Sequence, residues 1–358
     1  MSFKSNYFDW WLILPPLLLL TISITVLRSI TPTLVPFQIG FVVAGIIAFW
    51  IFSHFDYRVL ISLSTLLFIG SVLFLLTPVF FGSQSRGATR WLQFSQISIQ
   101  PSELVKPFLL IVFAAISVLN IHQSKKIALL LLAFVIPGAI IFFQPDLGSF
   151  LVLGIGWLTI FISQFSLKKI VFFGIIFLGI IMPTSWFFLK GYQKDRLTTF
   201  ISPYTDPLGR GYQVIQSVIT VASGQFWGRG LGHGTQSQLR FLPERHTDFI
   251  FASLSEELGF VGGATVLTLL TIFLWRIYNH SQTSSHQIGT LFCLASLNML
   301  AFQIFVNIGM NMGIAPITGI TLPFVSYGGS SLLSQCIILG IITSLSRHEI
   351  SSTSLQIS

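Results

Sequence analysis

The sequence carries very little charge. Only 8% of its 358 residues are Asp, Glu, Lys or Arg, whereas 53% are hydrophobic. Soluble domains contain about 25% charged residues, so this composition excludes an ordinary water-soluble protein. Between the few charges lie apolar runs of roughly 20 residues, each long enough to cross a hydrocarbon core of about 30 Å as a helix. The runs are continuous, whereas the strands of a membrane barrel would alternate polar and apolar residues.

Cysteine and cofactor motifs are also scarce. The two cysteines, Cys293 and Cys336, both lie inside apolar runs, which excludes a disulfide framework. No cluster of His, Cys and Asp has the spacing of a zinc site. The chain lacks a GxGxxG motif after a strand, which disfavours a nucleotide site. The net charge of +8 does not indicate nucleic acid, because in a membrane protein Lys and Arg mark cytoplasmic loops.

What is present is a series of ten apolar runs. We therefore predict an all-α polytopic membrane protein with about ten transmembrane helices, formed as a single domain over residues 1–358. The predicted spans are 10–27, 36–52, 58–80, 102–121, 127–143, 147–163, 170–189, 249–275, 288–309 and 330–344. A polar loop at 82–101 precedes the fourth span. The one long hydrophilic segment, about 190–247, separates the seventh span from the eighth.

The charges of the short loops predict the orientation. Placing the N-terminus inside puts eight Lys and Arg residues in the cytoplasm and three outside, as the positive-inside rule requires. The inner residues are Lys4, Arg58, Lys125, Lys126, Lys168, Lys169, Arg276 and Arg347, and the outer ones are Arg28, Arg86 and Arg90. Ten spans then place both termini in the cytoplasm and the 190–247 loop outside.

Ionisable residues concentrate at 241–263, where the long loop enters the eighth span. Such residues are costly at a bilayer boundary and usually functional. Asp248 directly precedes the apolar run, so partial desolvation would raise its pKa toward that of a general base. An Asp here would equally serve as the N-cap of the helix, and residue spacing leaves both roles open. For His246 the sequence leaves two roles open, that of a general base and that of a structural hydrogen-bonding residue.

Two further groups of polar residues are candidates for a site. Glu103 and Lys106 share one helix face at i and i+3, and Asp146 begins another span. Lone charges would be costly there, so we predict a buried network that ties two spans together, with phosphate binding by Lys106 as the alternative. In the long loop, a glycine-rich segment at 224–234 and seven nearby cations suit a pyrophosphate-bearing ligand. Those cations are Lys190, Lys194, Arg196, Arg210, Arg229, Arg240 and Arg245.

Nine motifs, in order, carry a family resemblance. They are GATRW (87–91), QPSELVK (100–106), QPDLGS (144–149), YQKDRL (192–197), DPLGRGYQVIQS (206–217), GRGLGHGTQS (228–237), LPERHTDFIF (242–251), EELGFVG (256–262) and PFVSYGGSS (323–331). Over most of its length the chain resembles the SEDS (shape, elongation, division and sporulation) family of bacterial peptidoglycan glycosyltransferases, the RodA/FtsW class. One departure is Ser149, where the family frequently has Thr.

The resemblance implies a function. It implies ten membrane helices in the bacterial cytoplasmic (inner) membrane, with a large extracytoplasmic loop between the seventh and eighth. It implies polymerisation of lipid II into glycan strands by inverting transfer, with release of undecaprenyl pyrophosphate. The essential acid of the family falls on Asp248, and Trp91 is carried over as critical for function. The PERH form of the motif and the short tails favour the elongation (RodA-type) branch over the division (FtsW-type) branch.

The resulting site prediction has one catalytic residue, Asp248. The predicted substrate-binding residues are Arg90, Trp91, Lys106, Arg196, Arg210, Gln236, Arg245 and His246. Which of the cations offsets the pyrophosphate charge stays open among Arg196, Lys106, Arg210 and Arg245. No resident metal is predicted, with Mg²⁺ or Mn²⁺ as an optional divalent cation.

The expected partner is a class B penicillin-binding protein, a transpeptidase, and no nucleic acid is expected. Two other functions compete with glycosyl transfer. A lipid II flippase would need a polar path across the bilayer, and a non-catalytic scaffold would tolerate replacement of Asp248.

Overall fold

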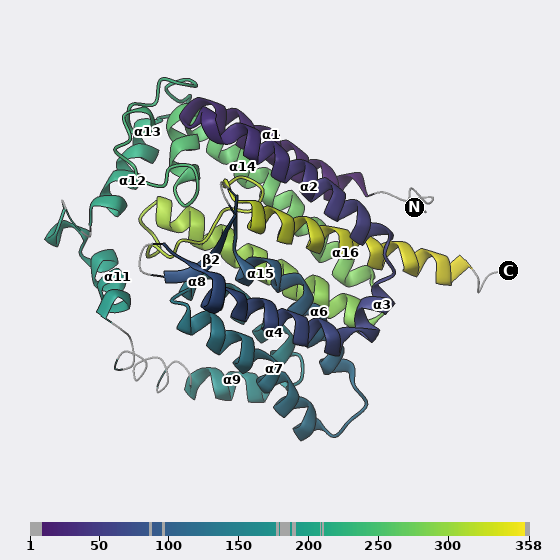
Figure 1. The fold of residues 1–358 in the computed structure, drawn as a ribbon. Coiled ribbons are helices and arrows are strands. Elements are labelled where there is room, and N and C mark those ends of the chain that lie inside the picture. The colour runs from purple at the N-terminus through teal and green to yellow at the C-terminus, as the bar shows by residue number, and fades with distance from the viewer. Residues whose placement is uncertain are drawn as a thin grey trace.

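Long apolar helices form the body of the computed structural model, which describes residues 9–85, 88–94, 97–176, 179, 187, 191–207, 209 and 211–354 (Figure 1). Within the described residues, seven helices are long and apolar enough to cross a membrane: α1 (Trp10–Ile30), α2 (Val35–His54, after the 3-10 turn Pro32–Leu34), α4 (Ser64–Phe81), α7 (Gln123–Phe143), α14 (Ile250–Thr283), α15 (Gln287–Asn311) and α16 (Gly329–Ser354). Two shorter apolar helices are α6 (Lys106–Val118) and α8 (Leu147–Ile162). The predicted multi-pass helical membrane fold is confirmed.

Short helices complete two of the spans. A helical segment, α3 (Tyr57–Ser62), precedes α4, and α5 (Pro101–Leu104) precedes α6. The predicted seventh span begins in α9 (Leu167–Ile176), and most of the rest of it lies outside the described residues. Each of the other nine predicted spans matches one helix or a pair of consecutive helices.

Helix α15 is the centre of the bundle. It packs against α14, α8, α6, α12 and α16, and α16 in turn packs against α2. Figure 1 shows α15 and α16 in the middle, with α1 and α2 on one side and α4 and α7 on the other. A helix that is apolar on all sides is stable only when other helices or lipid surround it, which explains this central position.

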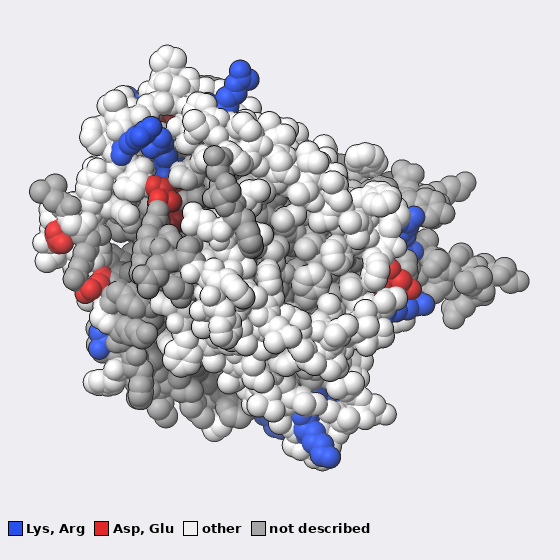
Figure 2. Space-filling view, in the orientation of Figure 1, with Lys and Arg blue, Asp and Glu red and all other residues white. Residues whose placement is uncertain are grey.

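The two ends of the bundle differ in character. The start of α1 and the end of α16 lie at one end, whereas α11 (Gly191–Ile201), α12 (Tyr212–Ser223) and α13 (Thr235–Gln238) lie at the other (Figure 1). On the face that Figure 2 shows, charged side chains gather toward these ends and leave a broad uncharged band between them. Such a band suits a hydrocarbon core, where charge is costly.

The 82–101 loop contains a small sheet that the sequence analysis did not predict. Strands β1 (Ser83–Ser85), β2 (Ala88–Phe94) and β3 (Ile97–Ile99) form an antiparallel sheet in the order β1-β2-β3. Leu92 pairs with Ile99 across it and is buried. Polar and apolar residues alternate over the paired segments 92–94 and 97–99, with the period of two that is typical of a strand.

The eighth span is broken, although we predicted a continuous helix. Gly259 in α14 has φ 68° and ψ −165°, a conformation that only glycine adopts readily. Backbone groups beside the break pair with the loop: Arg229 N donates to Glu256 O (2.9 Å), Gly230 N to Glu257 O (3.0 Å), Phe260 N to Gln225 O (2.9 Å) and Val261 N to Phe226 O (3.2 Å). The loop thus supplies the partners that a break in a membrane helix requires.

Two carboxylates next to the break fasten the outer loop. The Glu256 carboxylate accepts hydrogen bonds from Gln236 N (2.8 Å), Ser237 N (2.9 Å) and Ser237 Oγ (2.6 Å). The Glu257 carboxylate accepts from Ser29 Oγ (2.5 Å) and Gly232 N (3.1 Å). Both carboxylates are buried, and buried charges need such partners. They therefore act as anchors that join the loop, α1 and α14.

We expect Gly259→Ala to lower the free energy of unfolding by about 2 kcal/mol or more. An added Cβ would lie 2.2 Å from Gly228 N, in a backbone conformation that alanine avoids. Thermal unfolding of the purified protein in detergent measures the loss. Gly70→Ala is the matched control, because nothing lies within 4 Å of a Cβ built there. Equal midpoints for both variants would show that the break needs no glycine.

Candidate active site

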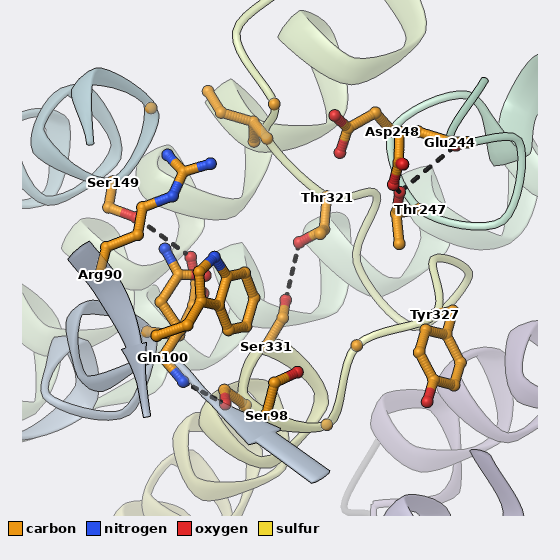
Figure 3. Close-up of a pocket in the computed structure, with 18 of the residues that line it drawn as sticks. Arg90, Ser98, Gln100, Ser149, Glu244, Thr247, Asp248, Thr321, Tyr327 and Ser331 are labelled. Atoms are coloured by element: carbon orange, nitrogen blue, oxygen red, sulfur yellow. Dashed lines mark hydrogen bonds between the residues drawn. The ribbon is translucent and has the colours of Figure 1, made fainter. Parts of the chain in front are cut away.

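A polar cavity of about 260 Å³ opens between five segments of the chain (Figure 3). Its main lining comes from the sheet and the start of α5, the start of α8, residues 244–248, residues 319–321 and the link from Tyr327 into α16, and Phe41 of α2 adds to it. All five segments belong to the end of the bundle that carries α12 and α13 (Figure 1). The cavity therefore lies where the long loop meets the membrane helices.

One wall is the turn of residues 244–248, which we call the 244–248 turn. Asp248 and Glu244 lie together on this wall, across the cavity from Arg90 and Gln100 (Figure 3). Thr247 Oγ1 donates a hydrogen bond to Glu244 Oε2 (3.1 Å). Glu244 has φ 52°, a left-handed conformation that costs a non-glycine residue about 1–3 kcal/mol and often marks functional sites.

The N-cap interpretation of Asp248 is wrong. Helix α14 begins at Ile250, and its N-cap residue is Phe249, whose side chain makes no capping hydrogen bond. Asp248 instead lines the cavity, and its Oδ2 lies 3.6 Å from the position of a Cβ built on Gly319. Gly319 has φ 74°, a conformation that favours glycine. The residue that faces the carboxylate therefore has no side chain.

The backbone of the 244–248 turn is held through three consecutive carbonyls. His246 O accepts from Tyr327 N (2.9 Å) and Thr247 O accepts from Ser326 Oγ (2.7 Å). Asp248 O accepts from two side-chain amides, Asn307 Nδ2 and Asn311 Nδ2, at 3.1 Å each. The turn is thus fixed against α15 and the α15–α16 link.

The opposite wall presents Arg90. Its Nη1 lies 3.4 Å from Asp146 Oδ1, and its Nε has no hydrogen-bond partner among the described residues. Asp146 is buried and also accepts from Gln100 Nε2 (2.6 Å) and Ser102 Oγ (2.9 Å). Arg90 is the only Arg or Lys among the cavity-lining residues that the structure describes. Its side chain is 29% exposed, so it offers a positive charge to a bound ligand.

Glu103, Lys106 and Asp146 lie in one buried polar network, as the sequence analysis expected. Lys106 is 1% exposed, and its Nζ lies 2.6 Å from Glu103 Oε1. Ser149 Oγ donates to Glu103 Oε1 (3.4 Å), and Ser102 Oγ contacts Ser149 Oγ (3.3 Å) as well as Asp146. The network links α5 and α6 to α8. The charged partner of Asp146 is Arg90, and Lys106 does not line the cavity.

The structure brings together only part of the predicted site. Asp248, Arg90, Trp91 and His246 line the cavity. Gln236 does not line it, and its backbone N–H binds Glu256.

Three further predicted cations remain, Arg245, Arg196 and Arg210. Arg245 donates from Nη2 to Ile30 O (3.1 Å), and burial, together with the charge of nearby Arg240, holds its pKa below the ordinary value. Arg196 belongs to α11, but its side chain lies outside the described residues, as does all of Arg210.

Several lining residues were not singled out from the sequence. Gln100 and Tyr327 fall inside recognised motifs but were given no role, and Thr321 lies outside them. Thr321 Oγ1 and Ser331 Oγ lie 2.8 Å apart (Figure 3). Burial raises the pKa of the Tyr327 phenol, which therefore stays protonated and able to donate.

The donor set does not fit a resident metal. Over the parts of the chain that the structure describes, no group of three or more His, Cys, Asp or Glu side chains is placed to hold one.

Comparisons with known sequences place the chain among relatives of shared function. Residues 7–351 match the family model of FtsW, RodA and SpoVE, described as cell cycle proteins. The chain is 36% identical to the peptidoglycan glycosyltransferase MrdB of Escherichia coli K12, over 87% of this chain and 85% of MrdB. It is 34% identical to stage V sporulation protein E of Bacillus subtilis 168, over 97% and 99% of the two chains. It is 38% identical to a probable peptidoglycan glycosyltransferase FtsW of Nitrosomonas europaea, over 72% and 67%.

Two solved structures share the fold. One is a chain from work on structural coordination of polymerization and crosslinking by a peptidoglycan synthase complex, with a TM-score of 0.82 and 31% identity over 95% of this chain and 98% of that one. The other is the crystal structure of the rod shape determining protein RodA of Thermus thermophilus, with a TM-score of 0.71 and 26% identity over 95% and 97%.

The buried pair Glu103–Lys106 gives a prediction for stability. Glu103→Gln leaves the Lys106 ammonium buried without a counter-charge, which costs about 3–5 kcal/mol. The double variant Glu103→Gln/Lys106→Met should lose much less, because replacing a whole buried ion pair is often nearly neutral. Unfolding of Glu103→Gln, Lys106→Met and the double variant in mixed micelles measures the coupling free energy between the two residues. Strictly additive losses would show that the pair does not act as a unit.

Proposed function

Because the chain belongs to the SEDS (FtsW/RodA/SpoVE) family, we propose that it is a peptidoglycan glycosyltransferase that polymerises lipid II into glycan strands. The observation that carries the proposal is the cavity, in which the carboxylate of Asp248 faces the guanidinium of Arg90. A base on one wall and a cation on the other suit a sugar transfer whose leaving group is a pyrophosphate.

In the proposed reaction, Asp248 is the general base. Its carboxylate takes the proton from the 4-hydroxyl of the acceptor GlcNAc. The hydroxyl oxygen then forms a bond to the anomeric carbon of the donor. The bond from that carbon to the pyrophosphate breaks, and its electron pair leaves with undecaprenyl pyrophosphate. A single displacement inverts the anomeric configuration from α to β, so no covalent sugar–enzyme intermediate forms.

Arg90 is the cation we assign to the pyrophosphate. Arg90 lines the cavity with a partly exposed side chain, whereas Lys106 is buried against Glu103 and Arg245 binds the end of α1. Arginine binds phosphate oxygens through several donors at once. The donor set offers no resident site for Mg²⁺ or Mn²⁺ within the described residues, and the mechanism has no step through one.

The reaction takes place at the outer face of the bacterial inner membrane in this proposal. The segments that line the cavity lie toward the end of the bundle opposite the start of α1 and the end of α16 (Figure 1), and the charges of the short loops favour cytoplasmic termini. A substrate anchored in the outer leaflet by its polyprenyl chain then reaches the cavity from the membrane.

The proposed partner is a class B penicillin-binding protein. The matching chain from a peptidoglycan synthase complex supports a transpeptidase partner, because that work concerns polymerization together with crosslinking. The PERH form of the motif supports the elongation branch, and the chain is 36% identical to MrdB and 38% identical to the FtsW relative.

We expect Asp248→Asn to lower polymerisation of labelled lipid II by at least about 100-fold, the usual effect of losing a general base. The assay uses the purified protein with its cognate transpeptidase, and gels resolve the glycan strands. Asp206→Asn is the matched control, because Asp206 is an exposed acid of the same outer loop that does not line the cavity. This control should keep wild-type activity.

Other results would redirect the assignment. Strands from Asp248→Asn at the wild-type rate would remove Asp248 as the base and shift the role to Glu244 or His246. No strands from any folded protein in the presence of its partner would favour lipid II translocation without glycosyl transfer.

A further inference from the structure

Two asparagines of α15 bind the backbone of the 244–248 turn, which forms one wall of the cavity. Asn307 and Asn311 are one helical turn apart, and both are 0% exposed. Each donates from Nδ2 to the backbone carbonyl of Asp248 at 3.1 Å. Buried side-chain amides in an apolar membrane helix are costly, so such a pair needs a reason.

Asn311 occupies the place of a helical hydrogen bond. In an α-helix the N–H of residue 252 would donate to the carbonyl of residue 248. Here Asn311 Nδ2 binds Asp248 O, while Asn311 Oδ1 accepts from Ala252 N (3.0 Å). One side-chain amide thus takes both backbone groups that would otherwise pair with each other, and α14 begins only at Ile250.

Asn307 joins the 244–248 turn to the 319–321 segment. Its Nδ2 donates to Ile320 O (2.7 Å) as well as to Asp248 O. Ile320 belongs to the 319–321 lining, where Gly319 faces the Asp248 carboxylate. The single amide therefore fixes the separation between the 244–248 turn and the 319–321 segment.

We propose that Asn307 and Asn311 are positioning residues that keep Asp248 out of the first turn of α14 and so hold its carboxylate in the cavity. The proposal rests on the proposed function of Asp248 as the base. Without Asn311, Ala252 N and Asp248 O can bind each other and extend α14 backwards. Residue 248 would then rotate with the helix, and its side chain would leave the cavity wall.

A purely structural role predicts something different. If the amides served only to bind α14 to α15, their loss would lower stability without moving residue 248. The backbone groups released by Asn311→Leu can pair with each other, so the variant should still fold. Gln303→Leu is the matched control, because Gln303 is a buried amide of α15 two turns before Asn311 that does not contact Asp248.

The first test measures the position of residue 248 without any activity. Asp248→Cys should react with a charged maleimide added from outside, and the native Cys293 and Cys336 are buried. Adding Asn311→Leu should slow this labelling at least tenfold, whereas adding Gln303→Leu should leave it unchanged. Asn307→Leu, which retains the Asn311 contacts, is the second variant and should slow labelling to a smaller extent. Labelling that neither asparagine replacement alters overturns the proposal.

The second test measures kinetics on lipid II in the otherwise wild-type protein. Asn311→Leu should lower kcat at least tenfold and leave KM within about twofold, because a displaced base impairs the proton transfer and not the binding. A parallel loss of kcat and thermal stability in Asn311→Leu and Gln303→Leu would instead indicate a structural role and overturn the proposal.

The two tests separate the failure of this inference from the failure of the proposed function. If Asp248→Asn polymerises lipid II like the wild type, Asp248 is not the base, but the labelling still decides whether the asparagines position residue 248. If Asp248→Asn is inactive and the asparagine variants keep full kcat, the base stands and the positioning role falls.

Discussion

Hydrogen bonds to three consecutive backbone carbonyls fix the conformation of the 244–248 turn, on which the candidate site depends. The carbonyls of His246, Thr247 and Asp248 each accept a hydrogen bond from α15 or from the link between α15 and α16. Peptide carbonyls at the edge of a membrane domain need such partners, and these fix the turn in one conformation. The strained backbone of Glu244 persists because its surroundings over-determine it. Helix α15 is central to the bundle and therefore a rigid base for these contacts.

A second constraint comes from the break at Gly259. The break divides α14 into a short segment that follows the 244–248 turn and a long membrane helix. Loop backbone and the anchoring carboxylates Glu256 and Glu257 satisfy the polar groups around it. The long loop and the 244–248 turn consequently share one support, so a partner that moves the loop would also move the start of α14. A coupling of this kind needs no direct contact between the partner and the cavity.

The sequence predicted what depends on local pattern. Apolar runs located the spans, and the ionisable stretch before the eighth span located Asp248, because both are features of consecutive residues. The break at Gly259 was missed, since nothing local distinguishes that glycine from Gly262 or Gly263. Likewise, Arg245 and Gln236 lie in the right motifs, but the Arg245 side chain binds the end of α1 and the Gln236 backbone N–H binds Glu256, and only tertiary packing decides such contacts. The asparagine pair did leave a local sign: two amides four residues apart in an apolar helix.

The ion pairs around the cavity explain how the proposed base, Asp248, and the proposed cation, Arg90, can act in the same cavity. Glu103 is neutralised by Lys106, and Asp146 binds Arg90 through one nitrogen while Arg90 Nε stays without a protein partner. Asp146 therefore orients Arg90 without using all of its donors. If carboxylates enclosed Arg90 fully, few of its N–H donors would remain for a pyrophosphate. If no carboxylate held Arg90, its long side chain would lose conformational entropy on binding the ligand. Asp248 and Arg90 lie on opposite walls, which is the arrangement that the proposed single inverting displacement requires.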